Sequence, residues 1–158
     1  MQFQGIDTNS LPSSFSFLVQ VLRRASVEVV RKNALQLASI SNFNISEWRV
    51  VTGLYVFGKC SQKSLVDWAG DDQAQVSRCL WQLKEKDLVQ SEASPKDRRA
   101  VNFELTRLGA MLVEDAYPDM LKYAKRIDDS LNEEEKAIFI GLMNRIIEAT
   151  ELMPSGDQ

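Results

Sequence analysis

A change of hydrophobic period near residue 88 constrains the fold of this chain more than any other feature. Before that point, apolar side chains recur at helical spacing, at Val76, Leu80 and Leu83. After a short extended stretch at 88–92 and a turn-like stretch at 93–99, apolar and polar residues alternate, as in a half-buried strand, over 101–105. The pattern predicts a helix followed by a β-hairpin with a basic turn at its tip.

Helical patterns also precede this unit. The spacing predicts a long amphipathic helix over 12–39, a second helix over 47–58 and a short third helix over 62–69. Ser46 and Ser61 are the expected N-caps of the second and third helices, and Gly70 should end the third.

The fourth helix is expected to start at Asp72, which with Gln75 has the form of a capping box. Its apolar stripe stops near Asp87, a residue able to take a left-handed conformation at a helix end, although less easily than glycine. A fifth helix should begin after Thr106 and be kinked or split at Pro118.

The last helix follows a second capping box, Asn132 to Glu135. Its apolar stripe comprises Ile138, Leu142, Ile146 and Ala149. The element order predicts a mainly α fold with a small β-hairpin wing, a winged helix-turn-helix flanked by N- and C-terminal dimerisation helices. We expect a single domain over 1–158, a DNA-binding lobe at 46–106, and dimerisation helices at 12–40 and 107–152.

Composition narrows the function classes. The chain has no histidine, which excludes a Ser-His-Asp triad, a Cys-His dyad and any histidine metal site. It has no Gly-rich phosphate loop either, so we expect no enzyme, no cofactor and no metal. The absence of a leader and of a long apolar run predicts a cytoplasmic protein without a membrane span. The net charge of −3 means that nucleic-acid binding would need a local basic patch.

The motifs resemble those of the MarR family of transcriptional regulators over about residues 15–152. The resemblance is carried by Val76-Ser77-Arg78, Leu88-Val89, Pro95-Lys96-Asp97-Arg98-Arg99 and Leu105-Thr106-Arg107-Leu108-Gly109. The Asp-Arg-Arg turn followed at this spacing by Leu-Thr-x-x-Gly is the specific part. The chain departs from the family at Asp87, where glycine is usual, and at Ser91, where a basic residue is common. The first departure affects the helix exit, and the second removes a phosphate contact.

The side of the fourth helix opposite its apolar stripe carries side chains suited to reading bases. Gln and Arg recognise adenine and guanine edges in the major groove, usually from the N-terminal part of a recognition helix. The candidate DNA-binding residues on this helix are Gln73, Ala74, Gln75, Ser77 and Arg78. A merely solvated polar face is the alternative. Trp81 shares that side, where it would contact DNA or cover the wing or a neighbouring helix.

The basic turn is the second candidate DNA contact, formed by Lys96, Asp97, Arg98 and Arg99. The family resemblance implies that a wing arginine enters the minor groove while Asp97 orients it. Arg99 is the preferred groove residue, Arg98 is the alternative, and Lys96 would contact phosphate. A charged hairpin tip that only keeps the edge soluble is the competing interpretation.

The resemblance also implies a small-molecule site between the dimerisation helices and the DNA-binding lobe, for an aromatic or phenolic effector. The candidate lining residues are Phe15, Leu18, Arg23, Trp48 and Tyr55. Each of them also suits an ordinary core or interface. Cys60 and Cys79 are the only thiols, and we expect Cys79 to be a packing residue rather than a redox sensor.

Together these observations predict a homodimeric, sequence-specific DNA-binding regulator, a repressor whose affinity for a pseudo-palindromic operator responds to a small effector. A winged-helix module that binds protein instead of DNA is the alternative hypothesis. An enzyme ranks last.

Overall fold

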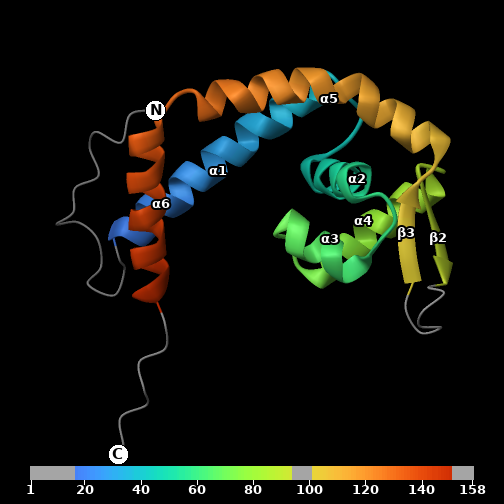
Figure 1. Ribbon diagram of the computed structural model, residues 1–158, viewed down its shortest axis with the longest axis horizontal. Coiled ribbons are helices and arrows are strands. Elements are labelled where there is room, and N and C mark those ends of the chain that lie inside the picture. Colours follow the sequence, from blue (N-terminus) through green and yellow to red (C-terminus); the bar gives the residue numbers. More distant parts are fainter. Residues whose placement is uncertain (1–16, 94–100, 151–158) are drawn as a thin grey trace, which may run out of the picture. The chain divides into compact units, whose positions relative to one another are not determined.

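The computed structural model describes residues 17–93 and 101–150. These residues form helices and a small antiparallel sheet (Figure 1). The helices are α1 (Phe17–Ala38), α2 (Ile45–Phe57), α3 (Gln62–Ala69), α4 (Gln73–Glu85), α5 (Arg107–Asp128) and α6 (Glu133–Glu148). The strands are β1 (Cys60–Ser61), β2 (Val89–Ala93) and β3 (Val101–Leu105), in the sheet order β1-β3-β2. This is the expected mainly helical winged helix-turn-helix. None of the helices among the described residues is long and apolar enough to cross a membrane.

The chain divides into two compact units, residues 1–118 and 119–158, with the boundary inside α5. In the first unit, α2 packs against both α3 and α4, while α3 and β3 also contact each other (Figure 1). The core is built from aliphatic side chains of these elements. Its fully buried members include Val50, Val51, Leu54, Leu65, Val76 and Leu83. The buried stripe of α4 is therefore the one that the sequence predicts.

The start of α2 lies two residues earlier than the sequence suggested. Asn44, not Ser46, is the N-cap: its side chain accepts a hydrogen bond from the Glu47 backbone N–H, and the Glu47 carboxylate accepts one from the Asn44 N–H. This reciprocal capping box satisfies two otherwise unpaired donors, which a cap at Ser46 would leave open. The prediction failed because both residues are suitable caps and only Asn44 has a glutamate three positions later.

The caps of α3 and α4 lie where they were predicted. Ser61 caps α3, and Gly70 ends it in the left-handed conformation. Asp72 caps α4 by accepting the Gln75 N–H. The capping box is only half formed, however, because the Gln75 side chain hydrogen-bonds along the helix instead of returning to the cap. Asp87 has a φ of 56°, the left-handed exit that the sequence indicated.

The hairpin is confirmed, with β2 and β3 antiparallel and Val89 opposite Leu105. The sequence analysis missed β1, a two-residue strand that pairs Cys60 with Phe103 and Ser61 with Asn102. A strand of this length has no hydrophobic period of its own, and only the position of β3 creates it.

The start of α5 explains the Leu-Thr-x-x-Gly motif. The Thr106 hydroxyl donates to the Asp87 carbonyl at 2.7 Å and accepts the Gly109 N–H at 3.0 Å. The Thr106 N–H donates to the Leu88 carbonyl. A Cβ at Gly109 would lie 2.1 Å from that same Leu88 oxygen. The threonine thus joins the helix to the turn after α4, and the glycine permits the close approach.

Pro118 does not split the fifth helix. It lies inside α5, which runs continuously from Arg107 to Asp128. Proline removes one backbone donor and so weakens a helix without always ending it. In the second unit, α6 starts at the predicted capping box of Asn132 and Glu135. No residue of α6 is buried, and its large apolar side chains Ile138, Phe139, Ile140, Leu142 and Ile147 are all about half exposed.

Candidate nucleic-acid interface

The outward face of α4 is polar and accessible. Gln73, Ala74, Ser77 and Arg78 are exposed, and Trp81 is the most exposed large apolar residue, at 64%. The opposite face is anchored by Val76, Leu80 and Leu83. The fold therefore presents on one surface four of the five residues that were expected to read DNA from this helix.

Gln75, the fifth, occupies the flank of the helix and is half-buried. Its amide nitrogen points to the buried Cys79 sulfur at 3.8 Å, and its amide oxygen accepts a hydrogen bond of 2.6 Å from the Arg78 guanidinium. Gln75 is thus engaged with its own helix, and its contact orders the long Arg78 side chain, which lowers the entropic cost of placing it.

Two interactions hold the start of α4 in place from neighbouring helices, and a third joins those two helices to each other. Gln62 of α3 donates to the Gln73 carbonyl in the first turn of α4. Arg49 of α2 forms an ion pair of 3.0 Å with Asp71, just before the N-cap. The Trp68 indole of α3 donates to the Arg49 carbonyl at 3.1 Å. The outward face is therefore carried on a well-connected helix, as a reading surface requires.

The tip of the wing, with Lys96, Asp97, Arg98 and Arg99, lies outside the described residues. At the base of the hairpin, the Lys59 amine contacts carboxylates of both strands, Glu92 at 2.6 Å and Glu104 at 3.3 Å. The pKa of Lys59 is raised, chiefly by its hydrogen bond to Glu92. The pKa of the Glu104 carboxyl is lowered, first by a hydrogen bond from Gln90 and then by Lys59. Lys59 thus neutralises acidic groups that would repel a phosphate backbone.

The departure from the family at Ser91 is accompanied by a basic group from another element. The Lys84 amine of α4 lies 2.7 Å from the Ser91 hydroxyl oxygen. Positive charge therefore stands beside the strand position where a basic side chain is usual. The sequence pattern did not reveal Lys84 because it lies seven residues away on a different element.

The residues expected to line an effector site are spread over the described part of the chain. Phe15 lies outside it. Leu18 and Arg23 are exposed on the first half of α1, whereas Trp48 is buried on α2 against the Phe43 ring, at 6.0 Å between centroids. The Tyr55 ring lies against the Tyr117 ring of α5, with 5.5 Å between centroids and 42° between the ring planes.

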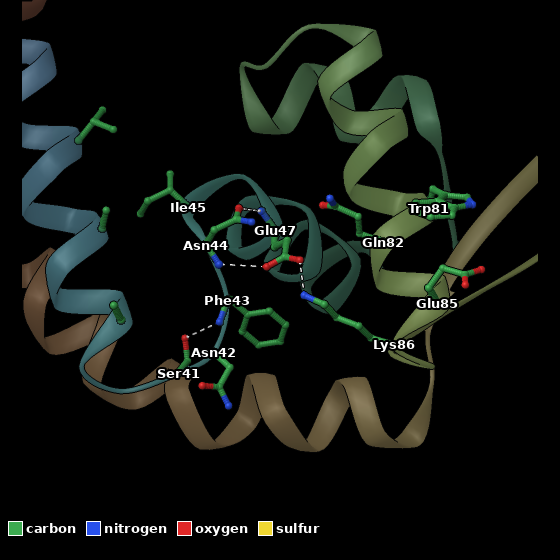
Figure 2. A pocket seen from close by; sticks show the side chains of 13 residues that line it. Ser41, Asn42, Phe43, Asn44, Ile45, Glu47, Trp81, Gln82, Glu85 and Lys86 are labelled. Atoms are coloured by element: carbon green, nitrogen blue, oxygen red, sulfur yellow. Dashed lines mark hydrogen bonds and ion pairs between the residues drawn. The ribbon is translucent and has the colours of Figure 1, made fainter.

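Hollows that lie elsewhere among the described residues are not lined by those candidates. One of them, of about 930 Å³, lies among α1, the connection to α2, and the end of α4 (Figure 2). A second, of about 410 Å³, lies among the same connection, the residues after α4, and the start of α5. Lys86 lines both, and its amine forms an ion pair of 2.6 Å with the buried Glu47 carboxylate. The sequence analysis missed this pair because its members are 39 positions apart.

The two thiols are poorly suited to redox sensing. Cys79 is buried in α4 and Cys60 is half-buried in β1. Burial raises the pKa of both thiols, which suppresses the reactive thiolate. The interpretation of Cys79 as a packing residue is thereby supported.

Known proteins share both the sequence pattern and the fold of this chain. Residues 43–101, which span α2 to the start of β3, match the sequence profile of the MarR family. The HTH-type transcriptional repressor NicR of Pseudomonas putida is 33% identical over 94 residues, which cover 60% of this chain and 60% of NicR. The match thus spans less than two thirds of that relative.

Solved structures extend the similarity to most of the fold. A structure of BpsR from Bordetella bronchiseptica, described in terms of the regulation of its DNA binding by 6-hydroxynicotinic acid, shares 26% identity, with a TM-score of 0.67 over 83% of this chain and 98% of that one. A mutant of MarR from E. coli in complex with operator DNA shares the fold, at 18% identity, with a TM-score of 0.69 over 82% of this chain and 92% of the other. Residues 43–101 thus resemble the MarR family, and the winged helix-turn-helix fold of known regulators is shared over most of the chain.

Proposed function

We propose that this protein is a dimeric, DNA-binding repressor of transcription that acts in the cytoplasm and responds to a small aromatic effector. The observation that carries the proposal is the outward face of α4, which exposes Gln73, Ser77 and Arg78 on a helix anchored by a fully buried stripe. The relationship to a named repressor in Pseudomonas putida supports the direction of regulation.

In this proposal α4 enters the major groove. Arg78, ordered by Gln75, is placed to recognise a guanine edge, and Gln73 an adenine edge. Lys84 would contact phosphate beside the strand. The wing would follow the minor groove, with Asp97 orienting Arg99, or Arg98 in its place. Phosphate contacts make the affinity strongly dependent on salt.

The exposed apolar side chains of α6 support a homodimer. No residue of this helix is buried among the described residues, and side chains such as Ile138, Phe139 and Leu142 are half exposed, which is typical of a face that packs against a second copy. A two-fold dimer reads a pseudo-palindromic operator, with half-sites about one helical turn, ~34–36 Å, apart.

The effector proposed for this chain is an aromatic acid or phenol. The printed description of BpsR as regulated by 6-hydroxynicotinic acid makes that compound the first to test. Phe15, Leu18, Arg23, Trp48 and Tyr55 remain candidates for effector binding. By linkage, the effector can change DNA affinity only as far as it binds the two states of the protein differently.

The deciding experiment measures binding of the purified full-length protein to labelled DNA from its own upstream region over a range of salt concentrations. We expect Arg78→Ala and Arg99→Ala each to weaken specific binding by about 1–3 kcal/mol, roughly 5- to 150-fold. The control is Arg31→Ala, which removes an exposed charge from α1. The proposal fails if the wild-type protein shows no salt-sensitive preference for that DNA and neither substitution has an effect.

The alternative function, a protein-binding winged-helix module, is favoured by one observation. Trp81 is 64% exposed on the face that would otherwise read DNA. Such a module would not bind DNA even at low salt, and Trp81→Ala would abolish binding of its protein partner. The same salt titration therefore separates the two functions.

A further inference from the structure

The outer side of α2 and α3 carries large apolar side chains that are exposed. Val56 and Phe57 of α2 and Trp68 of α3 are each about half exposed, whereas Leu54 and Leu65 on the same two helices are buried. The two helices pack against each other (Figure 1), so the exposed residues form one surface, which we name the α2–α3 patch. Exposed apolar patches on soluble proteins mark interaction sites.

The indole of Trp68 is held in a fixed position within this patch. Its N–H donates to the Arg49 carbonyl at 3.1 Å, and its ring meets the Phe57 ring edge-on, with 5.1 Å between centroids and 83° between the planes. A Cβ at Gly53 would lie 2.8 Å from the indole Cδ1. Glycine inside a helix lowers its stability relative to alanine, and here it makes room for the indole. A ring that is already fixed loses little freedom when it binds a partner.

Two oppositely charged side chains lie on α3 near Trp68. Lys63 and Asp67 are exposed and four residues apart, so they share one face of the helix. Within the described part of the chain neither forms an ion pair, and a lysine that precedes the acid is the less favourable order for pairing along a helix. Lys59, by contrast, is held by Glu92 and Glu104. The face of α3 therefore offers one cation and one anion to a partner.

A hollow of about 540 Å³ lies at the patch. The described residues that line it are Phe57, Cys60, Ser64, Asp67 and Trp68. A lysine side chain across the indole, with its amine near the Asp67 carboxylate, suits this lining, because an ammonium group is attracted both to the face of an aromatic ring and to a carboxylate. The hollow therefore has the chemistry to receive a lysine from another molecule.

The patch also supplies the kind of side chain that it is suited to receive. In a two-fold contact one surface meets itself. With the axis perpendicular to α3 and beside its middle, the two α3 helices run antiparallel, and Lys63 of each copy comes opposite Asp67 and Trp68 of the other. Both charges are then paired, and the exposed rings cover one another. A basic peptide would leave Lys63 facing a like charge, so the patch favours a second copy of the chain.

We propose that the α2–α3 patch is a self-association surface, through which the lobe of one molecule contacts the lobe of another by two reciprocal Lys63–Asp67 pairs. This contact is distinct from the proposed dimer, which is argued from α6, and it does not depend on DNA. The patch offers far fewer residues than the roughly 20–30 a side of a standard stable interface, so the association is weak and concentration-dependent.

The weak contact has a consequence on DNA that rests on the proposed function. Two dimers on neighbouring operators are held at a high effective concentration by the DNA that they share. The contact between their lobes then makes their binding cooperative.

Charge reversal in solution tests the proposal without DNA. Sedimentation equilibrium of the purified full-length protein, from micromolar to near-millimolar concentration, should show a mean mass that rises with concentration. Lys63→Asp and Asp67→Lys each bring like charges together at both ends of the contact, so each should weaken association at least about tenfold. An equimolar mixture of the two variants should recover association to within about threefold of the wild type, because every contact between unlike molecules pairs opposite charges.

The matched controls are Lys84→Asp and Glu85→Lys, which make the same changes of net charge at exposed positions of α4 outside the patch. Both should leave the association unchanged. Trp68→Ala should weaken it at least about tenfold, as is typical of a tryptophan at the centre of an interface. Trp81→Ala removes a more exposed tryptophan of α4 and should have no effect. Circular dichroism verifies that all variants are folded.

A wild-type mass that stays constant over the whole concentration range overturns the proposal. So does a mixture that remains as dissociated as either charge variant alone, or an equal loss in the α4 controls. DNA binding is read separately, from the salt titration. Association that follows the charge pattern, in a protein that ignores DNA, would keep the interface and reject the proposed function. DNA binding without self-association would keep the proposed function and reject the interface.

Discussion

The winged helix-turn-helix lobe and helix α6 differ in how far their apolar side chains are buried. In the lobe, apolar side chains such as Val51, Leu65 and Leu83 are fully buried by neighbours from the same chain. In α6, apolar side chains of similar size, such as Ile138 and Leu142, are about half exposed, and no residue is buried. Both segments begin with a capping box built from Asn and Glu. Local sequence signals therefore do not distinguish them, whereas the availability of a packing partner does.

This difference indicates which apolar surfaces a single chain buries by itself. The candidate reading surface is built from elements whose apolar core is buried within the lobe. The helix α6 exposes more apolar surface than a solitary helix keeps in water. The proposed homodimer would supply the missing partner.

The largest expected effect is on stability, and it appears when alanine replaces a glycine in each region, Gly109 and Gly141. A Cβ at Gly109 would lie 2.1 Å from the Leu88 backbone oxygen, whereas a Cβ at Gly141 of α6 would meet nothing within 4 Å. We expect Gly109→Ala to lower the free energy of unfolding by about 3 kcal/mol, because backbone must move. We expect Gly141→Ala to change it by no more than about 1 kcal/mol, in the stabilising direction. Urea denaturation measures both, and equal losses at the two sites would contradict the comparison.

The next effect concerns the apolar face of α6. The double substitution Ile138→Asp and Leu142→Asp should convert the proposed dimer to a monomer and raise the dimer dissociation constant at least about 100-fold, because two charges would be desolvated at the interface. Light scattering coupled to size-exclusion chromatography measures the mass. Asn144→Asp adds a charge to the same helix and is the control. A double variant that stays dimeric would show that α6 is not the interface.

A smaller effect on stability is expected when the N-cap residues of the two capping boxes are replaced. Asn44→Ala should cost about 2 kcal/mol, the upper end for an N-cap, because Asn44 also holds the buried Glu47 that pairs with Lys86. Asn132→Ala should cost about 0.5–1 kcal/mol, because its partner Glu135 is exposed. Both values come from urea denaturation at one protein concentration. A larger loss at Asn132 would show that α6 is buried by a partner around its cap.

The smallest effect lies on the exposed side of α1. The Arg31 guanidinium hydrogen-bonds Glu28 and lowers the pKa of that carboxyl to about 2. A pKa that is lower in the folded state stabilises the fold above the ordinary value of 4.5, and this contribution is lost as the pH falls towards 2. Because both side chains are exposed, solvent screens the pair. Glu28→Gln should therefore leave the melting temperature at pH 7 unchanged, while NMR titration of the wild type detects the low pKa. A clear drop in melting temperature would contradict this account.

Much of the candidate interface could be predicted from the sequence because its signals are local. The stripe of Val76, Leu80 and Leu83 implied that Ser77 and Arg78 face outward, and this is observed. The caps at Ser61 and Asp72, the left-handed Asp87 and the presence of a hairpin likewise follow from residues close together in the chain.

The predictions that failed concern residues that compete for one role, or side chains that are brought together only by folding. Asn44 displaced Ser46 as a cap because Glu47 completes the box only with Asn44. The side chain of Gln75 turned to Cys79 and Arg78, which are adjacent to it only on the folded helix. Of the two outcomes expected at Pro118, a kink or a split, the split is not observed, because α5 runs continuously from Arg107 to Asp128.

The sequence alone determined the order of the helices and of the two hairpin strands, the inward and outward faces of α4 and the resemblance to the MarR family, since period, caps and motifs are properties of neighbouring residues. Only the tertiary structure brought Lys86 to Glu47, Lys84 to Ser91, and Gly109 against Leu88. Each of these contacts joins different elements, whose approach is set by the packing of the whole core rather than by any local pattern.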